Sequence, residues 1–246
     1  PFWLKLARAS GVLSAPSRAR QLSQGMADTA NVALVYGSFF MGDCERDIKV
    51  IQDSFPKVSG LAGLELREPV EGNAFDFNSL KDCRVLIICT SSQIGFPPPN
   101  FRDFAHALLQ AASSNPGCLS HLRHAVYGNG DETYHKTYMN VPRYVDRLLE
   151  KCGSTRFFAR GETGEPNAQM GSDQCTCTEW APAMWSELAS SIAAEADGAP
   201  LQPVAWDALW AERRSETHEK VTEWDLAALE GKLGKPSAPP SMFAKL

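Results

Sequence analysis

Short apolar runs alternate with segments of helical spacing along most of the chain. The runs have the length of typical strands and lie at 32–36, 64–70, 84–89, 121–128 and 154–161. The predicted helices carry apolar residues three or four positions apart and cover 43–55, 101–112, 141–153 and 175–196. The run at 84–89 is continuously apolar, as expected for a central parallel strand. This alternation predicts an α/β fold with a doubly wound, five-stranded parallel sheet.

Both ends of the chain depart from this pattern, so the sequence predicts a leader at 1–30, an α/β domain at 31–194 and a C-terminal extension at 195–246. The first 25 residues contain arginine and serine but no Asp or Glu, which resembles an organelle transit segment. We therefore expect a plastid or mitochondrial location; a cytoplasmic location is the alternative, with Met26 as a start-like position. In the extension, Trp206, Leu209 and Trp210 fall on one helical face. We expect the leader and the extension to pack on the body or on a partner protein.

Charge and composition exclude several classes of protein. The chain has 24 Lys+Arg against 29 Asp+Glu, and the basic residues Lys5, Arg8, Arg18 and Arg20 concentrate in the leader. The remaining acidic body does not suit nucleic acid, whereas it suits a basic protein partner or a solvated surface. The sequence contains no apolar run of about 18 residues, so it predicts no membrane-spanning helix. Seven irregularly spaced cysteines argue against a disulfide-stapled secreted scaffold.

Three loops follow predicted strands, at 37–44, 90–100 and 128–138. In doubly wound sheets, ligands bind beyond the carboxyl ends of the strands, at the point where the strand order reverses. Because all three loops leave those ends and are rich in small, polar or aromatic residues, the sequence predicts that they converge on one cofactor pocket.

These loops resemble those of the flavodoxin family. VYGS at 35–38 is similar to the entry of the family's phosphate loop, TSSQIGFPPPN at 90–100 to its second loop, and YGNGDETYHKTY at 127–138 to its third. The resemblance covers about 31–193 and implies a strand order of 2-1-3-4-5. It also implies binding of FMN, whose ring carries single electrons. By this resemblance the FMN contacts are Ser38, Gly42, Thr90, Ser91, Ser92, Gly95, Gly128, Asn129, Gly130 and the stacking residue Tyr134. No catalytic residue and no metal site are predicted.

The phosphate loop departs from the family pattern. Ser38 is the single hydroxyl in a loop where relatives carry several, and Asp43 lies where another hydroxyl would help. A carboxylate about 4 Å from a phosphate costs roughly 4 kcal/mol at an effective dielectric of about 20. Asp43 is therefore either hostile to phosphate or a cap of the following helix. Phe39, Phe40 and Phe96 are the side chains that could fill the pocket instead of a cofactor.

Two functions follow from these observations. The first is an electron-transfer protein that binds FMN and shuttles single electrons between protein redox partners. The second is a flavin-free accessory subunit of a large photosynthetic or respiratory complex in an organelle, held there by the leader and the extension. Both describe a redox carrier or a non-enzymatic subunit rather than a stand-alone enzyme.

Overall fold

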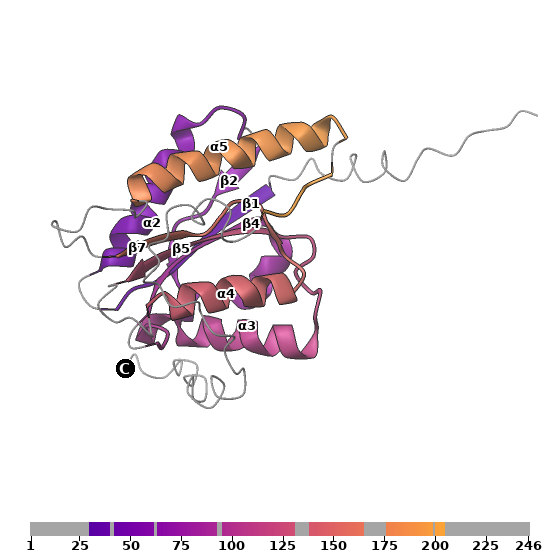
Figure 1. Cartoon of the computed structure of the whole chain (residues 1–246). Helices are drawn as coiled ribbons and strands as arrows, with labels where there is room; N and C mark the ends of the chain where they lie inside the picture. Colours follow the sequence, from indigo (N-terminus) through magenta and orange to yellow (C-terminus); the bar gives the residue numbers. More distant parts are fainter. Residues whose placement is uncertain are drawn as a thin grey trace, which may run out of the picture.

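A parallel sheet with helices on both faces forms the body of the protein (Figure 1). The computed structural model describes residues 30–39, 42–61, 63–92, 95–130, 138–164, 176–198 and 200–204. The strands are β1 (Ala30–Gly37), β2 (Leu64–Leu66), β3 (Val70–Glu71), β4 (Cys83–Ser91), β5 (Arg123–Gly130), β6 (Thr155–Arg156) and β7 (Gly161–Gly164). The α-helices are α2 (Asp43–Ser54), α3 (Arg102–Ser114), α4 (Asn140–Lys151) and α5 (Cys177–Ala196). Short 3-10 turns lie at Phe55–Lys57, Gly72–Ala74, Phe77–Asp82 and Pro99–Phe101.

The sheet has the order β2-β1-β4-β5-β6, with β3 also paired to β1 and β7 also paired to β5. All these pairs are parallel. Counting β2 with β3 and β6 with β7 gives the predicted order 2-1-3-4-5, so the α/β prediction is confirmed. Both edge strands are interrupted, so the sheet has seven strands where the sequence predicts five.

Each interruption has a physical reason. Between β2 and β3 the chain contains Pro69, which has no backbone N–H for the ladder. Between β6 and β7, the side chains of Arg156 and Arg160 both reach the carboxylate of Asp146. Four residues of extended strand would separate those two positions by about 13 Å, so leaving the regular ladder brings them together.

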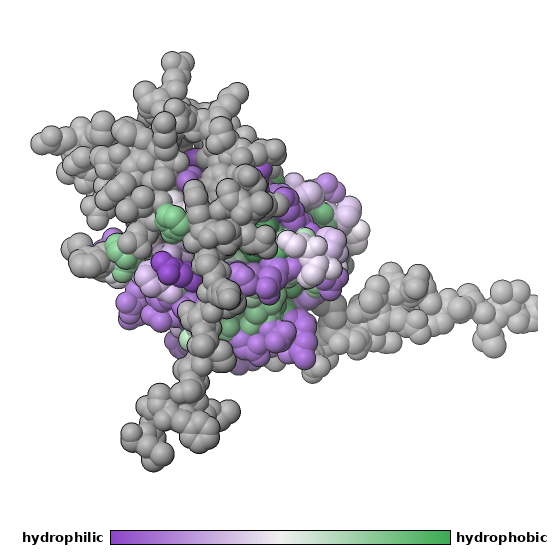
Figure 2. All heavy atoms as spheres, turned by 90° about the horizontal axis from the view of Figure 1, so that it is seen from below, coloured by the Kyte–Doolittle hydropathy of each residue, from purple (hydrophilic) through white to green (hydrophobic). Residues whose placement is uncertain are grey.

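The two faces of the sheet bury separate apolar cores. Helices α3 and α4 cover one face, where Val35, Ile88 and Val126 are buried. Helices α2 and α5 cover the other, where Leu34 and Ile87 pack with α5. A view from below, onto the side of α3 and α4, shows hydrophilic side chains around smaller apolar areas (Figure 2). This is the expected outer surface of amphipathic helices.

The indoles of α5 anchor that helix to the rest of the domain. Trp180 and Trp185 are fully buried, and their Nε1 atoms donate to the carbonyls of Ala159 (2.9 Å) and Ile51 (2.8 Å). Beyond α5, Val204 N donates to Arg156 O at 3.0 Å, so residues 200–204 pass beside β6. The leader up to residue 29, and the extension beyond residue 204 with its predicted helix, lie outside the described residues. Within the described part of the chain, none of the helices combines the length and the apolar character needed to cross a membrane.

Candidate functional site

The carboxyl ends of β1, β4 and β5 lie side by side in the centre of the sheet. Gly37 is paired with Thr90, and Ser91 is paired with Asn129. Ser38 follows Gly37 directly, so these chain ends bring Ser38, Ser91 and Asn129 to one edge. This edge includes the junction of β1 and β4, where the strand order reverses, as the sequence predicts.

Two hydroxyls at this edge have no hydrogen-bond partner among the residues that the structure describes. Ser38 Oγ and Ser91 Oγ are buried, and neither makes a hydrogen bond in the part of the chain that the structure describes. A buried polar group without a hydrogen bond costs about 1–3 kcal/mol. Such groups are uncommon in native proteins, so these neighbouring hydroxyls make the strand ends a candidate ligand site.

The main chain beside Ser38 is held by the second loop. Ser38 N donates to Asn100 Oδ1 at 3.2 Å, and Asn100 Nδ2 donates to Glu71 Oε1 at 3.1 Å. Asn100 therefore bridges the end of β1 and the end of β3. Burial raises the pKa of Tyr36, and the negative charges of Glu71 and Glu45 raise it further. The outer rim of the first loop is thus acidic.

The start of α2 does not bear out Asp43 as the helix cap. The residue at the N-cap position is Gly42, at φ 71°, and no side chain caps the helix there. The carboxylate of Asp43 instead forms an ion pair with Arg46, one turn later in the helix. Arg46 partly offsets the charge that would oppose a phosphate. Phe40 lies outside the described residues, whereas Phe39 is 43% exposed and does not plug the strand ends.

The second loop carries three hydroxyls. That of Ser91 has no hydrogen-bond partner among the described residues, whereas those of Thr90 and Ser92 lie near polar groups of the protein. Thr90 is fully buried, and its Oγ1 lies 3.5 Å from Ser91 O. Ser92 Oγ accepts a hydrogen bond from Val141 N at 2.8 Å, so it satisfies a backbone donor in the first turn of α4. Gly95 has φ 82°, a conformation that glycine adopts readily. Phe96 is half-buried.

The third loop begins with residues that fasten it to neighbouring helices. Asn129 Nδ2 donates to Asp47 Oδ2 at 2.8 Å. Burial raises the pKa of Asp47, and this hydrogen bond partly counteracts the increase. At Gly128 a Cβ atom would lie 2.6 Å from Met139 Sδ and 2.8 Å from Pro142 Cβ. Glycine is therefore required at Gly128 for the approach of α4.

The return of the third loop contains a strained residue that sequence reasoning missed. Met139 has φ 56°, in the left-handed region, and is completely buried at the N-cap of α4. Such conformations cost of order 1–3 kcal/mol and cluster at functional sites. Gly130 pairs with Gly164 of β7. The predicted stacking residue Tyr134 lies outside the described residues.

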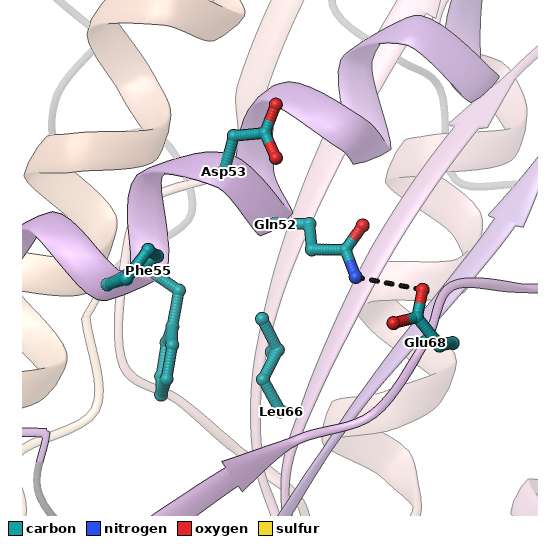
Figure 3. Close-up of a pocket in the computed structure, with 6 residues that line it drawn as sticks. Gln52, Asp53, Phe55, Leu66 and Glu68 are labelled. Carbon is teal, nitrogen blue, oxygen red and sulfur yellow. Dashed lines mark hydrogen bonds between the residues drawn. The ribbon is translucent and has the colours of Figure 1, made fainter.

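A separate hollow lies beside the C-terminal end of α2 (Figure 3). It is open and is lined by Gln52, Asp53, Phe55, Pro56, Leu66 and Glu68. Leu66 is paired with Val32, near the beginning of β1, so the hollow belongs to the opposite edge of the sheet. Gln52 Nε2 donates to Glu68 Oε2 at 3.0 Å. Because Asp53 and Glu68 line this hollow, it does not suit an anionic ligand.

Comparisons with known proteins agree with this geometry. Residues 60–180 match the family model described as flavodoxin. A short-chain flavodoxin associated with a non-canonical PDU bacterial microcompartment has a TM-score of 0.51 at 18% identity, over 65% of this chain and 96% of its own. A cysteine mutant of the flavodoxin from Pseudomonas aeruginosa has a TM-score of 0.51 at 21% identity, over 65% and 97%. The chain has a flavodoxin-like fold.

Curated relatives of this chain are much longer proteins. The bifunctional cytochrome P450/NADPH–P450 reductase 1 of Bacillus subtilis is 36% identical over 113 residues, which is 45% of this chain and 10% of that protein. The bifunctional cytochrome P450/NADPH–P450 reductase of Bacillus cereus is 29% identical over 170 residues, or 69% and 15%. The NADPH–cytochrome P450 reductase of Phanerodontia chrysosporium is 29% identical over 171 residues, or 67% and 22%. The chain therefore spans less than a quarter of the length of these relatives.

Between α4 and strands β5 to β7, the protein contains a buried network of charges. Asp146 of α4 is fully buried and accepts hydrogen bonds from Arg156 Nε (2.8 Å) and Arg160 Nη1 (2.6 Å). His124 Nε2 lies 3.1 Å from the same carboxylate. Burial acts to raise the pKa of Asp146, but His124 and the two guanidinium charges outweigh it and hold the pKa well below its ordinary value.

The network continues to the first turn of α4. Glu162 of β7 accepts hydrogen bonds from Arg160 Nε (2.8 Å), Arg143 Nε (2.8 Å) and Arg143 Nη2 (2.6 Å). Arg143 also lies over the ring of Tyr138, 5.8 Å from its centroid. Burial acts to raise the pKa of Glu162, but the two arginines lower it to about 2. These contacts fix the segment in which the third loop returns to α4.

Proposed function

We propose that this chain binds FMN at the carboxyl ends of β1, β4 and β5 and transfers single electrons between protein redox partners. The observation that carries the proposal is the pair of buried hydroxyls of Ser38 and Ser91, which have no hydrogen-bond partner among the described residues and lie at the junction where the strand order reverses. The ring and phosphate of FMN supply both hydrogen-bonding groups and an anion for such a site. The match to flavodoxins and to reductases supports the same ligand.

The residues of this chain divide the binding between them. Ser38 and the start of α2 at Gly42 would hold the phosphate, since an uncapped helix N-terminus offers free backbone donors. Thr90, Ser91 and Gly95 would border the ring from the second loop. The segments at 128–130 and around Tyr134 would enclose it from the third. Bound FMN accepts and donates electrons one at a time.

Not every predicted contact is equally open to the cofactor. The hydroxyl of Ser92 accepts from α4, and the amide of Asn129 donates to Asp47. We infer that these two residues shape the site by holding α4 and α2 in place, whereas Ser38 and Ser91 contact the ligand. This division gives the proposal a residue-level test.

A protein partner is part of the proposal, because the relatives named above are reductases of cytochrome P450. The acidic rim formed by Glu45 and Glu71 at the first loop favours a basic docking surface on that partner. We further propose that the leader directs the protein to an organelle.

The decisive experiment is a titration of the purified full chain with FMN. Binding is measured by the quenching of FMN fluorescence and by the visible absorption spectrum. We expect saturable binding of one FMN per chain, and reversible reduction of the complex by dithionite. Replacing Ser91→Ala removes one hydrogen bond and should weaken binding about three- to tenfold. Ser114→Ala is the matched control, because this exposed serine bonds only within α3.

A chain that stays colourless and does not quench FMN fluorescence would refute FMN binding. It would favour the flavin-free accessory subunit. Equal FMN affinity of the Ser91→Ala and Ser114→Ala variants would refute the assigned role of Ser91.

A further inference from the structure

Two cysteines meet at the edge of the sheet opposite the strand carboxyl ends. Cys118 lies in the turn after α3, and Cys152 is the C-cap residue of α4. Leu119 N donates to Cys152 O at 2.8 Å, which joins the two turns directly beside the cysteines. A Cβ atom on Gly153 would lie 2.9 Å from Gly117 Cα, so the main chains also touch on the other side of the pair.

The spacing of the two main chains suits a disulfide bond. The hydrogen bond between Leu119 N and Cys152 O limits the separation of the Cα atoms of Cys118 and Cys152 to about 7.6 Å, from standard backbone dimensions. Disulfides usually join Cα atoms about 4.4–6.8 Å apart. Bond formation therefore needs at most a small movement of the turns.

Both side chains of the pair border the same apolar core. Cys152 belongs to the buried core between the sheet and the pair α3–α4, and Cys118 packs against that core. Cys152 Sγ donates to Leu108 O at 3.9 Å. Burial raises the pKa of Cys152 to about 12, and the neighbouring Cys118 adds to this increase. In the described part of the chain both are free thiols.

The six described cysteines differ in access to solvent. Cys118 is half-buried, whereas Cys44, Cys83, Cys89, Cys152 and Cys177 are all buried. An oxidant in solution therefore meets Cys118 first. Its buried neighbour Cys152 can react only with a sulfur that is already beside it.

We propose that Cys118 and Cys152 form a reversible disulfide, with Cys118 as the entry point for a small disulfide such as oxidised glutathione. The thiolate of Cys118 attacks oxidised glutathione, which forms a mixed disulfide and releases one glutathione thiolate. Cys152 then loses its proton to solvent and attacks the Cys118 sulfur, which forms the internal bond and releases the second glutathione. Two protein thiols are oxidised, and one glutathione disulfide is reduced to two thiols.

The order of these steps follows from the environment of each sulfur. At neutral pH Cys152 is a protonated thiol, so it is a poor first nucleophile. Once Cys118 is a mixed disulfide, the sulfur that Cys152 attacks lies in the adjacent turn, which the hydrogen bond from Leu119 N to Cys152 O holds in place. We expect the closing step to accelerate as the pH rises.

The test incubates the folded full chain with oxidised glutathione and follows it by intact mass and by mapping of unreduced peptides. We expect a product that has lost two hydrogen atoms, with a peptide linkage between Cys118 and Cys152 that dithiothreitol reverses. Cys152→Ser should stop at one glutathione adduct on Cys118, and Cys118→Ser should give neither product. Cys83→Ser is the control, because this buried cysteine lies in the same core and should leave the reaction unchanged.

Three results would overturn the proposal. The first is a wild-type chain that retains the glutathione adduct on Cys118 without closing. The second is a linkage of Cys118 or Cys152 to any other cysteine. The third is a wild-type chain that does not react under conditions in which a denatured sample does. Peptide mapping of the wild type decides the matter even if a variant fails to fold.

Discussion

Replacing Glu162 with glutamine tests the energetic role of the buried charge network. Glu162 is 13% exposed and holds the guanidinium groups of Arg143 and Arg160. Its pKa falls from the ordinary 4.5 to about 2 on folding. At about 1.4 kcal/mol per tenfold change, this difference stabilises the folded state by about 3 kcal/mol at neutral pH. We therefore expect Glu162→Gln to lower the free energy of unfolding by about that amount.

The pH dependence of the loss distinguishes charge from shape. Because the pKa of Glu162 is lowered in the folded state, its stabilising contribution is present above pH 4.5 and is lost as the pH falls toward 2. The difference between the wild type and Glu162→Gln should therefore be full at pH 7, about half as large near pH 3, and close to zero at pH 2.

Urea unfolding followed by circular dichroism at several pH values measures this difference. Glu150→Gln is the matched control, because Glu150 also pairs with an arginine, Arg156, but is 45% exposed. An exposed pair contributes about 0–1 kcal/mol, so this variant should resemble the wild type. If Glu162→Gln were equally destabilising at pH 7 and pH 3, the loss would come from altered packing, and the electrostatic account would be refuted.

Three further measurements test other parts of the structure. Without FMN, Ser91→Ala should raise the free energy of unfolding by about 1 kcal/mol, because it removes a buried hydroxyl that lacks a partner; unfolding with saturating FMN should show that this gain disappears. Gly128→Ala should lower the free energy of unfolding by about 1–3 kcal/mol in thermal or urea melts, since its Cβ would collide with Met139. Closing the Cys118–Cys152 disulfide should raise that free energy by about 4 kcal/mol, measured as the difference between oxidised and reduced samples, because it constrains a loop of about 35 residues.

The central elements of the fold could be predicted from the sequence because each is encoded locally. The apolar run at 84–89 and the helical spacing of 43–55 became β4 and α2 with small changes at their ends. The edge strands could not be predicted in the same way. The break after Leu66 has a local signal in Pro69, whereas the break before Gly161 depends on the distant Asp146. When tertiary contacts interrupt a strand, the apolar pattern of its sequence does not change, so the pattern does not reveal the break.

The sequence predicted where the candidate site lies, but it did not predict the hydrogen-bond partners of the residues there. From the loop positions and the family resemblance, we expected Ser38, Ser91 and Asn129 at neighbouring strand ends. The register of β1, β4 and β5 confirms this position. That Asn129 would bind Asp47, 82 positions earlier in the chain, has no local signal. The hydroxyl of Ser92 is likewise committed to α4 by a contact that forms only when the two segments pack.

The buried network explains why the third loop can return to α4 through a strained residue. Met139 holds a left-handed conformation that a methionine does not favour, and the contacts that follow it must compensate. Arg143, four residues later, is fixed by the carboxylate of Glu162 and lies over the ring of Tyr138. The ion pair of Arg143 therefore stabilises the first turn of α4. The same turn can approach β5 only because Gly128 has no side chain. Because the third loop ends at this turn, the stability of the network and the geometry of the proposed FMN site depend on the same few contacts.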